Sequence, residues 1–235
     1  MTDHISSAYD RDLDQIQTLV MKMGGMVEEA ILSAAKSLET RDIALAERVR
    51  QGDKLIDALE QDINDEAART IALRAPVSKD LRSILTVLRI SASLERIGDY
   101  AKNIAKRTGT VVNMPEIAGS DSALRRMARE VQAMLKDVLD AYLRMDVALA
   151  QEVRLRDHDV DEMYNALFRE FLTFMMEDPR NITTCMHLHF MAKNVERMGD
   201  LVTNIAEQVI FLVTGEMPDE ARPKGDKTSY MTDPS

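Results

Sequence analysis

The chain has 235 residues, with 40 acidic against 30 basic side chains, so its formal net charge is -10. Proteins that bind nucleic acids need a basic surface to displace counterions from phosphates, which argues against a nucleic-acid partner. The same balance argues against an anionic membrane surface as the main partner. The aromatic content of 4%, without any Trp, disfavours a β-rich fold.

Three features of the sequence predict a cytoplasmic protein without a membrane span. The single cysteine, Cys185, excludes an intramolecular disulfide framework and suits a reducing compartment. The first residues are polar and charged, unlike a secretory signal. The most apolar runs, such as residues 209–213, are far shorter than the roughly 20 residues that cross a bilayer.

Helical periodicity extends from Tyr9 to Thr214 and is broken at five places, which predicts six helices. The breaks lie at residues 38–42, 75–78, 109–121, 145–146 and 178–179. Asp42 and Asp146 are suited to cap the helices that follow them, and Ser78 is the candidate cap of the third helix. At the last break, Asp178 precedes a proline at the first helical position.

The two halves of the chain repeat each other. Residues 42–57 align without gaps on residues 146–161, and eight of these sixteen positions are identical. Residues 95–105 align on residues 196–206, with seven of eleven positions identical. This repetition predicts an all-α fold of two tandem three-helix bundles. The predicted units are residues 1–108, a linker at 109–121, residues 122–215, and a disordered tail at 216–235.

Each third helix carries three oxygen-bearing side chains spaced four residues apart, and this spacing places them on one stripe of the helix surface. They are Glu95, Asp99 and Asn103 in the first repeat and Glu196, Asp200 and Asn204 in the second. Carboxylates at this spacing repel each other by about 0.2–0.5 kcal/mol. An Arg or Lys side chain, or a hard cation, would relieve that repulsion.

Antiparallel pairing of neighbouring helices should bring further acids to this stripe. It places Asp57 level with Glu95 and Asp53 level with Asp99, while the first helix adds Glu28 or Glu29. The second repeat supplies Asp157 and Asp161, but it has Gln132 and Ala133 in place of the first-helix acids. Carboxylates without His or Cys suit Mg, Ca, Mn or iron ions, so we predict a cation site. The first repeat has more candidate ligands for it than the second.

Two alternatives to this metal site stay open. The acids could instead be solvated or neutralised by Arg96 and Arg197, and Gly98 and Gly199 inside the motif could simply relieve a tight helix crossing. A metal-dependent phosphohydrolase or oxidase could also be built on the carboxylates. No Glu-x-x-His pair, phosphate-binding loop or nucleophile motif accompanies them, so we predict a protein that is not an enzyme.

The motif Glu-Arg-Ile-Gly-Asp-Tyr-Ala-Lys-Asn-Ile-Ala at residues 95–105, repeated at 196–206, resembles the signature of the PhoU family of bacterial phosphate-transport accessory proteins. The resemblance covers residues 9–215. It implies tandem three-helix bundles assembled as a homodimer, and carboxylate faces that bind divalent or ferric ions (Mg, Mn, Fe or Zn). The candidate metal ligands are Glu28, Glu29, Asp53, Asp57, Glu95, Asp99, Asn103, Asp157, Asp161, Glu196, Asp200 and Asn204.

The same resemblance implies a regulatory role. Members of the PhoU family act as negative regulators of the phosphate-starvation response and of phosphate uptake. They are thought to couple the ATPase side of the phosphate ABC transporter to a PhoR-type sensor histidine kinase. The expectation for this chain is therefore an adaptor that performs no chemical step.

Overall fold

The computed structural model describes residues 2–218, with side chains from Tyr9 onward. Over this range the chain forms six α-helices, one short 3-10 helix and no strand, which confirms the all-α prediction. The helices are α1 (Thr2–Glu39), α2 (Ile43–Arg74), α3 (Lys79–Val111), α4 (Ser120–Arg144), α5 (Val147–Glu177) and α6 (Ile182–Thr214), with the 3-10 helix η1 (Pro179–Asn181) leading into α6.

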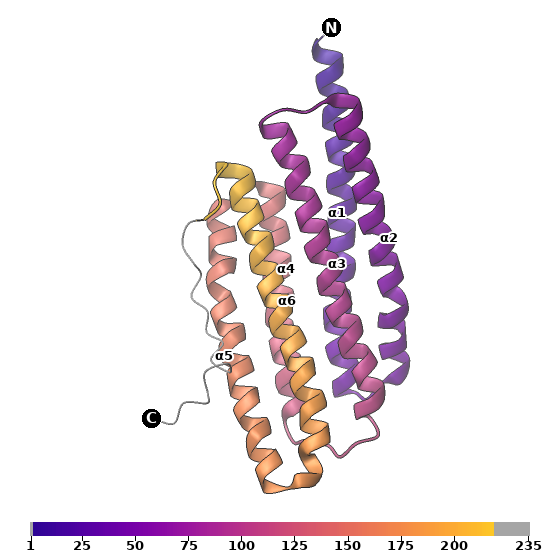
Figure 1. Ribbon diagram of the computed structural model, residues 1–235, viewed down its shortest axis with the longest axis vertical. Coiled ribbons are helices and arrows are strands. Elements are labelled where there is room, and N and C mark those ends of the chain that lie inside the picture. Colours follow the sequence, from indigo (N-terminus) through magenta and orange to yellow (C-terminus); the bar gives the residue numbers. More distant parts are fainter. Residues whose placement is uncertain (1, 219–235) are drawn as a thin grey trace.

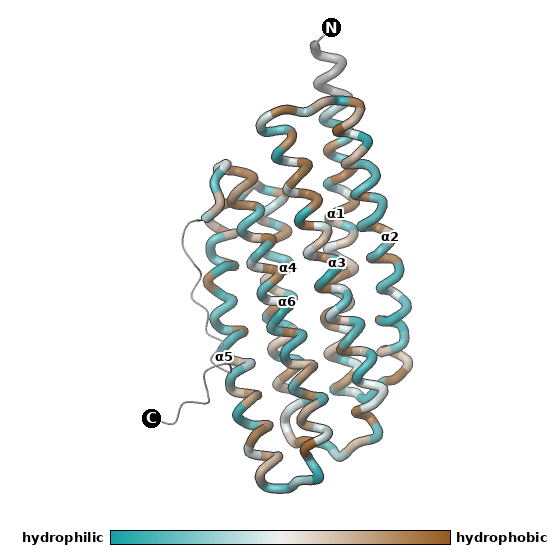
Figure 2. Tube along the Cα trace, viewed as in Figure 1, coloured by the Kyte–Doolittle hydropathy of each residue, from teal (hydrophilic) through white to brown (hydrophobic). Residues whose placement is uncertain are grey.

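Each helix forms because its apolar residues recur with helical spacing. In α1, Ile16, Val20, Met23 and Val27 are all fully buried and follow one another at intervals of three or four residues, so they share one face. Figure 2 shows the consequence along the whole fold, with hydrophilic and hydrophobic residues alternating along every helix. One stripe of each helix is therefore available for packing, and the remainder faces solvent.

Three of the four predicted helix caps are confirmed. The side chains of Asp42 and Asp146 accept hydrogen bonds from the backbone N–H of the residue three positions on, at 2.8 and 3.0 Å. Asp178 accepts from the backbone N–H of Arg180 at 2.9 Å. The prediction for Ser78 is wrong, since its backbone has φ 51° and ψ -111° and not the extended conformation from which a cap side chain reaches the first turn.

The predicted linker at 109–121 is longer than the connection that the structure shows. Helix α3 continues to Val111 and α4 begins at Ser120, so residues at both ends of the predicted linker are helical, and both of these terminal residues are buried. Of the tail predicted at 216–235, residues 219–235 lie outside the described residues.

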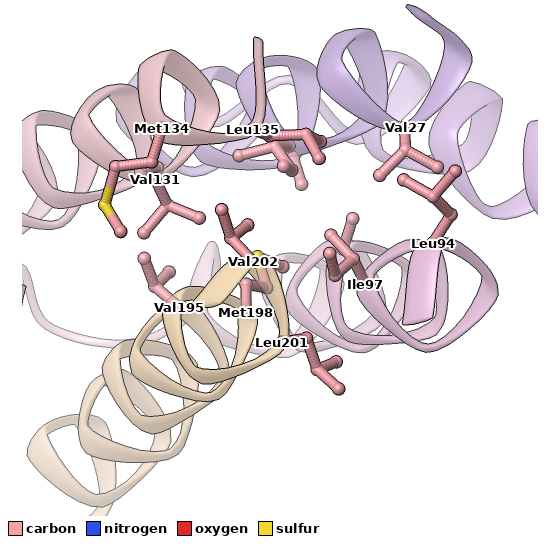
Figure 3. Packing of buried hydrophobic residues seen from close by; sticks show 14 of the residues in the cluster. Val27, Leu94, Ile97, Val131, Met134, Leu135, Val195, Met198, Leu201 and Val202 are labelled. Carbon is pink, nitrogen blue, oxygen red and sulfur yellow. The ribbon is translucent and has the colours of Figure 1, made fainter. Parts of the chain in front are cut away.

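The two repeats form two three-helix bundles that stand side by side, α1–α3 and α4–α6 (Figure 1). They join through two helix pairs, α1 with α4 and α3 with α6. Figure 3 shows the core at this junction, where Leu135 of α4 faces Val202 of α6, and Val27 of α1 faces Leu94 of α3. One continuous hydrophobic core therefore runs through both bundles.

Within residues 2–218, none of the helices combines the length and the apolar character that crossing a bilayer requires. The outer helices α2 and α5 do expose individual apolar side chains, including Leu55 and Leu155, which are 59% and 66% accessible. These side chains lie at positions that the junction between the bundles does not cover.

Candidate functional site

An acid of each second helix, Asp53 or Asp157, lies inside the hydrophobic stripe, whereas Asp57 is exposed. Asp53 of α2 follows Val49 and precedes Ile56 at core spacing, and only 4% of its surface is exposed. Asp157 of α5 occupies the equivalent position and is 3% exposed. Each repeat thus buries a carboxylate where an aliphatic side chain would be ordinary, and burial of an ionised group is costly unless a partner neutralises it.

In the first repeat the partner of Asp53 is a lysine from α3. The ammonium nitrogen Nζ of Lys102 lies 2.5 Å from Asp53 Oδ2 and 2.8 Å from Asp99 Oδ1, so it bridges the two helices. The second oxygen of Asp53, Oδ1, is buried and accepts no hydrogen bond from the described residues. A lysine therefore supplies the positive charge that the spacing of the acids requires, and the exposed Arg96 does not.

One lysine does not balance all the acids of the cluster. Burial raises the pKa of Glu95 above its usual value, and the charges of Asp99, Glu60, Asp57 and Asp53 raise it further. Burial and the charge of Asp53 likewise raise the pKa of Asp57, although Lys102 opposes this. The hydrogen bonds that Lys102 donates to Asp53 and Asp99 raise its own pKa. This electrostatic pattern is that of a negative cluster with a single internal counterion.

The fit of this cluster to a metal ion is incomplete. Its carboxylate oxygens, including the buried Asp53 Oδ1, are the ligand type that hard cations prefer. However, among the described residues no three His, Cys, Asp or Glu side chains converge closely enough to hold a metal ion. The ammonium of Lys102 lies between Asp53 and Asp99, at the point where a cation would bridge them. Metal ligation by these residues therefore stays a prediction.

The first-helix acids do not join the cluster. Glu28 lies on the side of α1 that faces α4, and its Oε2 accepts a hydrogen bond from Gln132 Nε2 at 2.7 Å. Glu29 lines a separate groove between α1 and α2, beside Arg48 and Gly52. Glu29 thus lies at the level of Asp53 along α2, as predicted, since Gly52 directly precedes Asp53 in the chain. Ligation of a cation by Glu28 or Glu29 stays a prediction.

Asn103 and Asn204, the last residues of the two motifs, also lie away from the buried acids. Asn103 is exposed and lines a cavity between α3 and α6 together with two basic side chains. Asn204 is exposed on α6. A stripe at intervals of four residues drifts around the helix by about 40° at each step, so its last member faces a different neighbour from its first.

The second repeat has the same acids in a different arrangement. Asp157, Asp161 and Glu196 are buried, and Asp200 is half-buried. Lys193 Nζ lies 2.9 Å from Glu196 Oε1. This lysine precedes its motif acid by three residues, whereas Lys102 follows Asp99 by three. The repeats therefore each place a lysine beside the motif, but from non-equivalent positions.

The glycines of the motif make room for these second-helix side chains. A Cβ on Gly199 would lie 2.8 Å from Asp157 Oδ1, and one on Gly98 would lie 3.2 Å from the terminal methyl of Ile56. The reading of both glycines as relief of a close helix crossing is confirmed.

The two lysines are the site residues that the sequence reasoning missed. A signal for them was present, because Lys102 and Lys193 each lie three residues from a motif acid and such residues are neighbours on a helix. The burial of Asp53 could also have been predicted, because its position continues the apolar stripe of α2.

A family model described as PhoU domain matches residues 20–108 and, a second time, residues 124–209. The chain belongs to the PhoU family. The two matches coincide with the two bundles, and the segment between them contains the connection from α3 to α4. Membership therefore applies to both repeats of the chain.

Similar proteins match the chain over nearly its full length. The "Phosphate-specific transport system accessory protein PhoU homolog" of Rhizobium meliloti is 43% identical over 97% of this chain and 96% of its own length. The homolog of the same name from Caulobacter vibrioides is 45% identical over 97% of this chain and 100% of its own length.

Solved structures agree with the fold. The crystal structure of PhoU from Pseudomonas aeruginosa superimposes with a TM-score of 0.85 at 36% identity, covering 88% of this chain and 100% of that one. The structure of the phosphate transport system regulatory protein PhoU from Streptococcus pneumoniae gives a TM-score of 0.83 at 27% identity, over 90% of this chain and 100% of that one.

Proposed function

We propose that this protein is an accessory regulator of a phosphate transport system, which holds the phosphate-starvation response and phosphate uptake in check when phosphate is plentiful. In this role it couples the ATPase subunit of the phosphate ABC transporter to a PhoR-type sensor histidine kinase. The coupling is a change of binding free energies between partners, and this chain performs no chemical step.

The observation that carries the proposal is the end-to-end similarity to phosphate-specific transport system accessory proteins in both repeats. The architecture supports it physically. Two bundles that share one core form a stiff body whose outer helices are far apart, α2 on one side and α5 on the other (Figure 1). Such a body offers two separate surfaces for two partners.

The proposal includes a homodimer and a cytoplasmic location. The exposed apolar side chains Leu55 on α2 and Leu155 on α5 provide surfaces that association would cover. Light scattering of the purified chain measures the dimer directly, and a monomer at micromolar concentration would remove this part of the proposal without affecting the regulatory role.

The regulatory role is tested in a bacterial strain whose own gene for this protein has been deleted and which carries a reporter of the phosphate-starvation response. We expect the reporter to be active at high phosphate in the deletion strain and repressed when this chain is expressed. Repression should require the sensor kinase and the transporter, so strains lacking either serve as controls.

Equal reporter activity with and without the chain, at matched expression of the kinase and the transporter, would overturn the proposal. A variant with Asp99→Asn, compared with Asp62→Asn on the exposed side of α2, then shows whether the carboxylate–lysine cluster takes part in signalling. Asp62 makes no ion pair within the described part of the chain and is therefore a matched acidic control.

A further inference from the structure

The seam between α3 and α6 contains a cavity that is open to solvent and has a basic lining, in contrast to the net acidic charge of the chain. Its volume is about 470 Å³, and it lies where the C-terminal half of α3 runs beside the N-terminal half of α6 (Figure 1). The lining residues are Asn103, Lys106, Arg107 and Thr110 of α3 and His187 and Asn194 of α6. None of these six is acidic, although the chain carries a net charge of -10.

The lining residues are arranged to present their polar ends together. The four from α3 follow one another at intervals of three, one and three residues, which places them on a single face of that helix. The two from α6 are seven residues apart, again on one face. A cavity with this lining presents amide N–H groups, a hydroxyl and two permanent cations toward one volume.

The side chain of Arg107 is held in place by groups that do not neutralise its positive charge. Its guanidinium carbon lies 4.6 Å from the centroid of the Phe190 ring, and its Nη1 lies 3.3 Å from His187 Nδ1. Within the described residues it forms no ion pair with a carboxylate. A guanidinium fixed by an aromatic face and a ring nitrogen retains donors for a bidentate contact with a tetrahedral oxyanion.

Asn194 adds a second, independent indication. The residue is only 9% exposed and its side chain has no hydrogen-bond partner within the described residues, but its amide atoms are not sealed from solvent, so they open into the pocket. An amide that is held by a nearly buried residue and opens into a pocket can donate to, or accept from, a polar group that enters it.

The repeat provides an internal comparison for this seam. The positions equivalent to Lys106 and Arg107 in the second repeat are Glu207 and Gln208, so the cations are absent there. Gln208 Oε1 instead accepts a hydrogen bond from Arg89 Nη1 at 3.3 Å across the same helix pair. The basic cavity is therefore a property of one end of the seam and does not follow from the duplicated fold.

We propose that this cavity binds a small molecule that carries a phosphate-type oxyanion, either inorganic phosphate or a phosphomonoester. The volume lies within the range of small-molecule sites, which is roughly 300–1,000 Å³. Arg107 and Lys106 supply charge, and Asn103, Asn194 and Thr110 supply neutral hydrogen-bonding groups that orient the oxyanion. The site is separate from the carboxylate–lysine cluster, and it does not depend on the proposed coupling of transporter and kinase.

Calorimetric titration of the full chain at low ionic strength tests the proposal. Inorganic phosphate and glycerol 3-phosphate are the two probes, and sodium chloride at matched ionic strength is the control for general charge attraction. We expect saturable binding of at least one probe at one site per chain, and no saturable signal with chloride. Comparison of the two probes distinguishes a site for the free ion from one that uses the remaining volume for an organic group.

Two variants locate the binding. Arg107→Gln introduces the residue that the second repeat has at the equivalent position, and Asn194→Asp adds a negative charge with little change of shape. Each should weaken binding by at least about tenfold, because charge-assisted hydrogen bonds are the strong contacts to oxyanions. Arg89→Gln, on the same helix but outside the cavity, should change the affinity by less than about twofold.

Circular dichroism melting of the three variants establishes that they are folded, and either cavity variant is sufficient for the comparison. Absence of saturable binding to the unmodified chain up to about 10 mM of both probes, an affinity weaker than about 3 kcal/mol at 25 °C, would overturn the proposal. Equal weakening by Arg89→Gln and the cavity variants would overturn it as well, since general charge attraction would then explain the binding.

Discussion

Asp53 is a carboxylate in a hydrophobic seam, and Lys102, which neutralises it, approaches from the solvent side. Lys102 remains 39% exposed while its nitrogen contacts the 4% exposed Asp53. An ion pair of this kind recovers little more than the cost of desolvating the acid, but removal of one partner leaves the other buried and unpaired. The pair is therefore better explained as fixing the position of α3 against α2 than as a large source of stability.

Replacement of Lys102 tests both the counterion and the predicted cation site. Lys102→Thr introduces the residue found at the equivalent position of the second repeat, Thr203. In the presence of a chelator we expect it to lower the free energy of unfolding by about 1–3 kcal/mol, the cost of leaving a buried acceptor unsatisfied. Urea unfolding measures this loss, with Lys54→Thr, an exposed neighbour of Asp53, as the matched control.

Addition of Mg²⁺ or Mn²⁺ should restore part of the stability of Lys102→Thr but not change that of Lys54→Thr, since the acids would then have room for a hard cation. If neither ion has any effect on Lys102→Thr, the predicted cation site of the first repeat is wrong.

The second prediction at the level of single residues concerns pH. The pKa of Glu95 is raised in the folded protein above its usual value of 4.5, so the folded state favours its protonated form. This contribution to stability is fully present below pH 4.5 and is lost as the pH rises through the raised pKa, so ionised Glu95 is unfavourable at neutral pH. Glu95→Gln should therefore stabilise the protein at pH 7 by about 0.2–0.5 kcal/mol.

Thermal melting at a series of pH values measures this effect. The gain from Glu95→Gln should disappear in acid, whereas Glu152→Gln, an exposed acid of α5, should show no comparable gain at pH 7. A stabilisation by Glu95→Gln that is the same at acidic and neutral pH would contradict the electrostatic explanation.

At the scale of helices, close approach at the motif glycines decides how α3 and α6 lie against their second-helix neighbours. The approach differs between the repeats, because the nearest atom to Gly199 is a carboxylate oxygen of Asp157 and the nearest to Gly98 is a methyl of Ile56. A methyl at the end of an aliphatic side chain can rotate away, whereas the buried Asp157 has little freedom to move.

The same substitution in the two repeats should therefore have different effects. Gly199→Ala should destabilise the protein by about 1–3 kcal/mol through overpacking. Gly98→Ala should be neutral or stabilise by up to about 1 kcal/mol, since alanine favours the helix. Urea unfolding of both variants gives the comparison, and equal effects in the two repeats would be inconsistent with the distances at the glycines.

At the scale of the whole molecule, the repeats meet through a pseudo-twofold junction. Glu28 and Gln132 occupy equivalent positions in the two repeats and are hydrogen-bonded to each other, as expected near an axis that relates the repeats. The core is continuous across this junction. The bundles are thus coupled, and neither has its apolar faces covered without the other.

We therefore expect a single cooperative unfolding transition. Leu135→Ala, at a fully buried junction position, should lower the free energy of unfolding by about 2–5 kcal/mol and shift the whole transition without splitting it. Circular dichroism and calorimetry are suitable probes because the chain has no Trp. Two separate transitions, of which only one responds to Leu135→Ala, would show that the bundles unfold independently.

The sequence by itself determined the helices, most of their ends, and the repetition of one three-helix unit in the two halves. These features are local or periodic: apolar stripes at helical spacing, aspartate caps at 42 and 146, and identities between aligned segments. It also placed four acids of each repeat correctly on the second and third helices. The resemblance to the PhoU family rested on the same motifs, and the family model that matches both repeats confirmed it.

Only the tertiary structure decided which groups meet. The counterion of Asp53 depends on how α3 is rotated against α2, and a rotation of one residue, about 100°, exchanges Lys102 for a neighbour. The assignment of Glu28 to the junction and of Asn103 to the basic cavity has the same origin. Helix rotation and crossing are set by many packing contacts at once. They place part of the acid excess in a cluster around a buried aspartate in each repeat, Asp53 or Asp157, and leave a basic cavity between the repeats.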